Sequence, residues 1–135
     1  MTGGLESALA EASSPSWTRR ARAGRDLASS ADVPEAAEVL LRLLLDAEDT
    51  AVTRRTAEAL ARTGTTAAVR LMALALVEAD DSRSDWLRTG VHDARVAPDG
   101  VPDVVEACGK LAQDREESVR RGAAEISVWA SGTSH

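Results

Sequence analysis

The feature that most constrains the fold of this chain is a recurrence at the length of a helix pair. Trp17, Val52, Trp86 and Val119 lie about 33 to 35 residues apart. An arginine lies two positions after each of them, and a small residue lies four positions after. These are Arg19, Arg54, Arg88 and Arg121, and Ala21, Thr56, Gly90 and Ala123. The recurrence predicts about four stacked units, each made of two helices.

The composition favours helices packed on helices. The 135 residues include no Phe, no Tyr and three Trp, so the apolar volume comes mainly from Leu, Val and Ala. Alanine has the highest helix propensity, and its small side chain lets helices approach closely. Strands favour the β-branched and aromatic residues, of which the aromatic ones are scarce in this chain. We therefore predict an all-α fold.

Capping and turn signals divide the chain into eight expected helices. Ser14 is a plausible N-cap of the second helix, Asp32 and Glu35 read as a capping box for the third, and Gly64 ends the fourth. The expected helices occupy about residues 5–12, 15–29, 32–46, 50–63, 66–79, 83–96, 101–113 and 116–130, with a turn at 80–82. We expect a single domain: a weak N-terminal helix in 1–14, the repeat core in 15–131 and a flexible tail in 132–135.

The hydrophobic pattern predicts the order of the stack. Residues 39–45 and 71–77 are apolar nearly all round their helices, which indicates helices covered on more than one side. The helix at 5–12 has only a narrow apolar stripe. The two apolar helices therefore belong to the central pairs, and the striped helix belongs to an end.

Two segments resemble the second helices of HEAT repeats, and most closely the HEAT-like repeats of phycobilisome lyases. They are DTAVTRRTAEAL at 49–60 and EESVRRGAA at 116–124. The family pattern is an acidic residue, a Val three positions later, an Arg directly after it, and then small residues. Here only Arg120 directly follows its column residue, and Thr18, Thr53 and Leu87 occupy the other three places. The resemblance covers about residues 15–131 and implies an α-solenoid of about four antiparallel helix pairs, a HEAT-like superhelix whose second helices line the concave face.

The charge balance argues against general nucleic-acid binding, and the short apolar stretches argue against a membrane span. The net charge is −6, whereas nucleic-acid binding requires a basic footprint that displaces counterions. Lys110 is the only lysine, a bias typical of GC-rich genomes, so we expect a bacterial protein. Residues 1–4 contain no basic segment and no apolar segment follows, which predicts no signal peptide. The longest apolar stretches are too short to span a bilayer, so we expect a cytoplasmic protein.

We predict no catalytic, cofactor-binding or metal site. A metal site at His92 would need Asp85, Asp93 and Cys108 to converge, and an ordinary surface histidine is the favoured interpretation. Cys108 lies on an apolar face with Val104, Val105, Leu111 and Ala112 and has no local base, so we interpret it as a core residue. The acidic clusters at 46–49, 80–81 and 114–117 precede second helices, whose N-terminal ends they would cap.

The recurring arginines are the candidate partner-binding residues. Arg54 and Arg121 have acidic residues four positions away, whereas Arg19 and Arg88 do not. An arginine at one phase of each second helix would form a ridge on the concave face, and arginine binds carboxylates in a planar, bidentate way. We therefore name Arg19, Arg54, Arg88, Arg121 and Trp86 as possible contacts to a partner with an acidic surface. For the three tryptophans, packing between Ala-rich helices is favoured over a binding hot spot.

The predicted function is a non-enzymatic protein–protein interaction module or adaptor, a scaffold whose concave face holds an unidentified protein. A toxin-neutralising immunity protein and a regulatory adaptor both fit this description. The first alternative is an enzyme subunit or lyase-like accessory protein, which rests on analogy with the lyase-associated repeats. The second is nucleic-acid binding, which the net charge disfavours.

Overall fold

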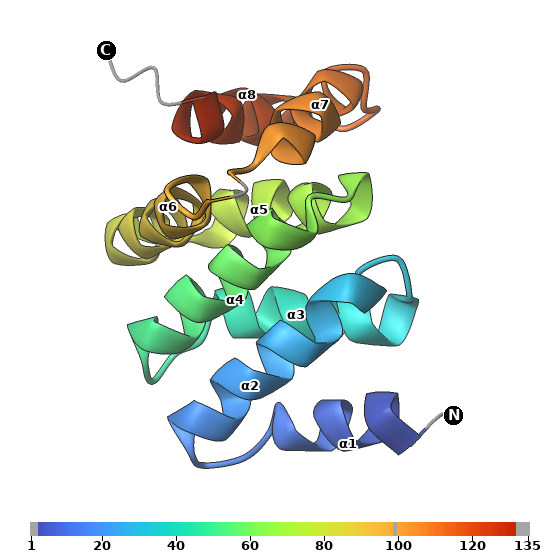
Figure 1. Cartoon of the computed structure of the whole chain (residues 1–135), viewed down its shortest axis with the longest axis vertical. Coiled ribbons are helices and arrows are strands. Elements are labelled where there is room, and N and C mark those ends of the chain that lie inside the picture. The colour runs from blue at the N-terminus through green and yellow to red at the C-terminus, as the bar shows by residue number, and fades with distance from the viewer. Residues whose placement is uncertain (1–2, 99, 132–135) are drawn as a thin grey trace.

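The computed structural model describes residues 3–98 and 100–131, and helices account for most of them (Figure 1). The helices are α1 (Gly3–Glu11), α2 (Trp17–Leu27), α3 (Pro34–Leu44), α4 (Thr50–Thr63), α5 (Thr66–Glu78), α6 (Asp81–Arg95), α7 (Pro102–Leu111) and α8 (Glu117–Ser131), with a 3₁₀ turn η1 (Ala28–Ser30) after α2. No strand occurs in the described part of the chain. The predicted all-α fold is confirmed.

The helices form antiparallel pairs that stack in two layers (Figure 1). The first helices of the pairs, α1, α3, α5 and α7, lie on one side, and the second helices, α2, α4, α6 and α8, lie on the other. Contacts run along the second-helix layer from α2 to α4, α6 and α8, and along the first-helix layer from α3 to α5 and α7. This arrangement is the α-solenoid that the period of about 34 residues predicts.

A single hydrophobic core runs through all four pairs. Leu27, Leu40, Leu60, Leu87 and Ile126 belong to its fully buried members, so each pair contributes at least one large side chain. The helix α5 is enclosed on several sides, because it contacts α3, α4, α7 and α8. The prediction that residues 71–77 are covered on more than one side is confirmed up to residue 76, and Val77 is exposed.

The small-residue column marks places where helices nearly touch. An added Cβ at Gly90 of α6 would lie 2.5 Å from the carbonyl oxygen of Arg54 and 2.7 Å from the Cβ of Ala57, both on α4. Gly122 of α8, the residue before Ala123 of the column, is similarly close to Ala73 of α5. Any side chain at these glycines would push the helices apart, so small residues at the column and beside it set the spacing of the helices.

Two helix starts differ from their predicted positions. The expected capping box of Asp32 and Glu35 is wrong: α3 begins at Pro34, and Val33 is its N-cap without a side-chain hydrogen bond. Proline suits the first turn of a helix and keeps the preceding residue extended, which moves the start past Asp32. The cap of α2 is Ser16. Ser14 instead accepts a hydrogen bond of 3.1 Å from the backbone N–H of Ser16.

The other helix boundaries follow the sequence signals within two residues. Gly64 ends α4 in the left-handed conformation, with φ of 66°, as predicted. The expected turn at 80–82 is shorter, because the Asp80 side chain caps α6 and residues 81 and 82 are already helical. The tail expected at 132–135 lies outside the described residues. None of the described helices is long and apolar enough to cross a bilayer.

Candidate functional site

Arg54 and Trp86, two of the predicted partner-binding residues, contact each other across the layer of second helices. Arg54 Nε donates a hydrogen bond of 2.7 Å to Asp93 Oδ2 on α6, and this bond raises the pKa of Arg54 above its usual value. The same guanidinium lies over the Trp86 ring, 5.8 Å from its centroid. Arg54 therefore ties α4 to α6, although its side chain is still 42% exposed.

The other three arginines of the column are exposed on separate helices. Arg88 lies 3.5 Å from Asp85, and Arg121 lies 3.2 Å from Glu117. Arg88 has no acidic residue four positions away, as the sequence analysis states, but Asp85 is three residues earlier, one helical turn away. Exposed pairs of this kind contribute little to stability. The side chain of Arg19 is exposed at the first turn of α2.

A buried arginine that the column analysis missed joins the first two pairs. Arg20 is 6% exposed, and its Nε and Nη2 donate to Asp46 Oδ1 and Oδ2 at 3.0 and 3.3 Å. Its Nη1 also donates to the carbonyl oxygen of Ser14. Arg70 of α5 makes an equivalent bond of 3.0 Å to Asp114 in the turn before α8. These arginines hold successive pairs together through the turns.

The turn acids recur at the repeat period, which is the signal that could have identified these links. Asp46, Asp80 and Asp114 lie 34 residues apart, each between the two helices of a pair. Asp46 accepts the backbone N–H groups of residues 48 and 49, and Asp114 accepts that of residue 116. The prediction that the acidic clusters cap second helices is confirmed for α4 and α6, where Asp49 accepts the N–H of Ala51 and Asp80 accepts that of Arg83. The bond from Arg70 holds the pKa of Asp114 below its usual value, and the N–H of Arg83 does so for Asp80.

A cationic groove of about 460 Å³ lies between α2 and α4. It is lined from α2 by Trp17, Thr18, Ala21, Arg22 and Arg25, and from α4 by Arg55, Glu58, Ala59 and Arg62. Four guanidinium groups thus face one carboxylate, in a chain whose net charge is −6. Arg62 pairs with Glu58 at 3.1 Å, whereas Arg22 and Arg55 form no ion pair within the described residues.

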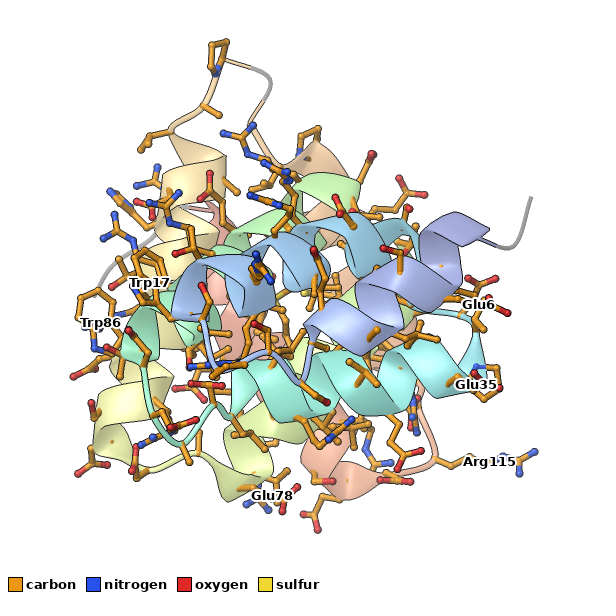
Figure 2. All side chains as sticks on the ribbon, turned by 90° about the horizontal axis from the view of Figure 1, so that it is seen from below. Glu6, Trp17, Glu35, Glu78, Trp86 and Arg115 are labelled. Atoms are coloured by element: carbon orange, nitrogen blue, oxygen red, sulfur yellow. The ribbon has the colours of Figure 1, made fainter. Side chains whose placement is uncertain are left out.

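The spacing of the groove residues explains how the two helices build it. On α2, residues 18, 22 and 25 are three or four positions apart and share one face. On α4, residues 55, 59 and 62 do the same. Trp17 is at the first position of α2 and is 42% exposed. Figure 2 shows Trp17 and Trp86 at the same edge of the molecule, the edge that the second helices form.

The residues considered for metal or nucleophilic chemistry do not converge. No group of three or more His, Cys, Asp or Glu side chains comes together within residues 3–98 and 100–131. His92 is exposed, and its Nδ1 lies 3.1 Å from Arg95 Nη2. Cys108 is buried with Val104 and Leu111 as predicted, and burial raises the pKa of its thiol to about 11. Val105 and Ala112, which were expected on the same buried face, are exposed.

The comparison with protein families identifies these stacked pairs. A family profile described as HEAT repeats matches residues 5–90, from α1 into α6. The chain belongs to the HEAT-repeat family. HEAT repeats are commonly protein-interaction scaffolds, and the family is typically non-enzymatic. The search of curated proteins and the search of solved structures gave no match.

The HEAT-repeat architecture extends beyond the matched residues. The last pair, α7 and α8, continues both layers, and α8 packs against α5 and α6. The inter-pair bond from Arg70 to Asp114 reaches into this last pair. The match is to HEAT repeats in general, so the resemblance to the phycobilisome-lyase type and the bacterial origin stay predictions.

Proposed function

We propose that this HEAT-repeat chain is a non-enzymatic interaction module that binds a protein partner through its second-helix layer. The observation that carries the proposal is the groove between α2 and α4, where four arginines and a half-exposed Trp17 gather on an acidic molecule. Tryptophan and arginine are the residues most enriched at binding hot spots. Both gather in this groove on the second-helix side.

The arginine column supports a binding role for the second-helix layer in two ways. Arg54 bonds Asp93 and stacks on Trp86, so it holds α4 and α6 in fixed register next to the groove. A fixed surface loses less conformational entropy on binding than a mobile one. Arg19, Arg88 and Arg121 are exposed on α2, α6 and α8 and extend the cationic surface along the layer. In this proposal they contribute to the charge of the face, while the groove supplies the main contact.

The experiment compares two exposed apolar side chains on opposite layers. A partner is captured from native lysate, identified, purified and titrated by calorimetry against wild type, Trp17→Ala and Val105→Ala. Trp17 and Val105 are 42% and 40% exposed, and Val105 lies on α7 in the first-helix layer. We expect Trp17→Ala to weaken binding at least ~10-fold, the size of a modest hot spot, and Val105→Ala to change it less than ~2-fold.

The opposite pattern contradicts the proposal. If Trp17→Ala binds the partner as wild type does while Val105→Ala loses affinity, then the first-helix layer is the binding face. Melting curves of both variants by circular dichroism check that each remains folded.

A further inference from the structure

We propose that the groove between α2 and α4 binds an acidic peptide segment of the partner, with carboxylates on Arg22, Arg25 and Arg55 and an apolar side chain against Trp17. This inference rests on the proposed function and names the chemistry that the same face recognises. It moves the recognition site from the arginine column to residues that face each other across the groove.

The arginines of the groove differ in their partners from the arginines that link one helix pair to the next. Arg20, Arg54 and Arg70 each bond an aspartate on another pair of the stack at 2.7 to 3.0 Å. In the groove, Arg22 and Arg55 have no ion pair among the described residues, and Arg25 is 3.7 Å from its neighbour Asp26 with both side chains exposed.

The groove therefore holds three guanidinium groups whose charge is not used by the fold. Arginine donates two parallel hydrogen bonds to one carboxylate, so each of the three is suited to a separate carboxylate of a ligand. Glu58 offsets the fourth arginine, Arg62, at 3.1 Å.

The dimensions of the groove fit a short extended segment. From Trp17 to Arg25, α2 rises about 12 Å, the length of three to four extended residues. Ala21 and Ala59 line the groove between the arginines, and Trp17 lies at its α2 N-terminal end. The matching ligand has two or three carboxylates next to one large apolar side chain that packs on the exposed indole.

Charge favours an acidic peptide over a nucleic acid. The molecule as a whole has a net charge of −6, which repels a long polyanion beyond the groove. Nucleic-acid affinity comes from many phosphate contacts in a row, and Glu58 interrupts the row of cations here. A short peptide needs only Arg22, Arg25 and Arg55, and it does not require a longer row of cations.

The test uses a defined probe and charge-matched variants. The probe is a fluorescein-labelled peptide with two glutamates on each side of one leucine, and its control has glutamines in place of the glutamates. Binding is followed by fluorescence anisotropy at low and physiological salt. The groove variant is Arg22→Glu with Arg55→Glu. Its control is Arg42→Glu with Arg115→Glu, which makes the same charge change at exposed positions on α3 and in the turn before α8.

We expect a Kd below about 1 mM for the glutamate peptide, at least ~10-fold weaker binding to the groove variant, and less than ~2-fold change for the control variant. Both variants should melt within about 4 °C of wild type, because the four arginines are exposed. Equal loss in both variants would mean general charge attraction and would overturn the proposal. So would the absence of measurable peptide binding, or tighter binding of a single-stranded DNA of equal charge.

The two proposals fail in different ways. If the peptide does not bind but Trp17→Ala still weakens binding of the identified partner, the second-helix layer is the binding face and the proposed acidic ligand is wrong. If the peptide binds the groove while Val105→Ala weakens binding of the partner, the groove is an acidic-peptide site, and the proposal that the partner binds the second-helix layer is wrong.

Discussion

Cys108 is a thiol whose position in the fold lowers its reactivity. It is 5% exposed on the inner face of α7, and burial raises the pKa of its thiol to about 11. The reactive species is the thiolate, and at pH 8 a pKa near 11 leaves only about one thiol in a thousand in that form. We expect iodoacetamide at pH 8 to label the folded protein at least ~100-fold more slowly than the same chain in guanidinium, as followed by mass spectrometry. Similar rates in the two states would show that Cys108 is accessible and activated.

At the scale of single residues, the sequence predicts burial better than it predicts partners. The face of Val104, Cys108 and Leu111 follows from helical spacing alone. The partners of Arg20 and Arg70 do not, because each bonds an aspartate 26 or 44 residues away across the stack. The groove arginines were also missed, because facing residues on α2 and α4 are known only once the two helices are placed side by side.

The spacing between neighbouring helices depends on a few glycines, and two of them have opposite expected effects. Gly90 of α6 is packed against the α4 backbone, and an added Cβ would lie 2.5 Å from the oxygen of Arg54. We expect Gly90→Ala to destabilise the protein by about 1–3 kcal/mol, the usual cost of overpacking. Gly109 of α7 has no atom within 4 Å of such a Cβ. Gly109→Ala should stabilise by about 0.5–1 kcal/mol, because alanine favours the helix.

Urea unfolding of the two variants measures both effects. A Gly90→Ala protein as stable as wild type would show that α4 and α6 separate freely, and the column of small residues would then have no packing role. A Gly109→Ala protein that loses stability would show that α7 is less helical than described.

Asp114 links α5 to the turn before α8, and this link depends on pH. Its folded-state pKa is below the usual value, first because of the bond from Arg70 and then because of the N–H of residue 116. A carboxyl group with a lowered pKa stabilises the fold above its unfolded pKa of about 3.9, and this contribution is lost as the pH falls through the folded value. We expect Asp114→Asn to melt below wild type at pH 7, with a gap that closes toward the acid end.

Melting curves from pH 7 to the acid limit of solubility check this prediction. The control is Glu106→Gln, an exposed carboxylate 3.8 Å from Lys110, which should melt as wild type does at each pH. A gap of constant size at all pH values would mean that the shape of the side chain matters and its charge does not.

At the scale of elements, the existence and order of the eight helices follow from the sequence, and their ends follow less closely. The helical periodicity and the alanine content predict where the helices lie, and Gly64 predicts the C-terminal end of α4. The start of α3 shows what local signals miss: Asp32 and Glu35 look like a capping box, but the geometry of Pro34 fixes the first turn instead. Where two local signals compete, as the capping pattern and the proline do here, the sequence does not show in advance which one sets the helix start.

Over the whole molecule, one hydrophobic core runs through the stack, and each pair covers the next. The period of about 34 residues predicts this architecture, because a helix pair cannot bury its apolar faces alone. The family match ends at residue 90, yet the core continues into α7 and α8 through Val104, Leu111, Val119 and Ile126. Whether the segment that matches the family folds alone therefore depends on how much apolar surface the last pair buries.

Deleting residues 101–135 should abolish cooperative folding, whereas deleting residues 1–14 should only weaken it. The last pair buries Val104, Leu111, Val119 and Ile126, and at about 1.5–3 kcal/mol each their loss amounts to much of the 5–15 kcal/mol that stabilises a typical domain. The deletion also uncovers the face of α5 that packs on α8. Of the α1 side chains that the structure describes, only Ala8 is buried, so deleting residues 1–14 costs far less.

Circular dichroism melts and size-exclusion chromatography distinguish the two deletions. The fragment 1–100 should aggregate or melt without a sharp transition, although it contains the entire family match. The fragment 15–135 should remain monodisperse and keep a cooperative melt at a lower midpoint, because the α2–α4 layer and the core below it are intact. If 1–100 melts as cooperatively as the full chain, then α7 and α8 are an appendage and the core does not need a fourth pair. Because every residue that lines the groove lies on α2 or α4, fragment 15–135 also gives a form in which peptide binding can be measured without α1.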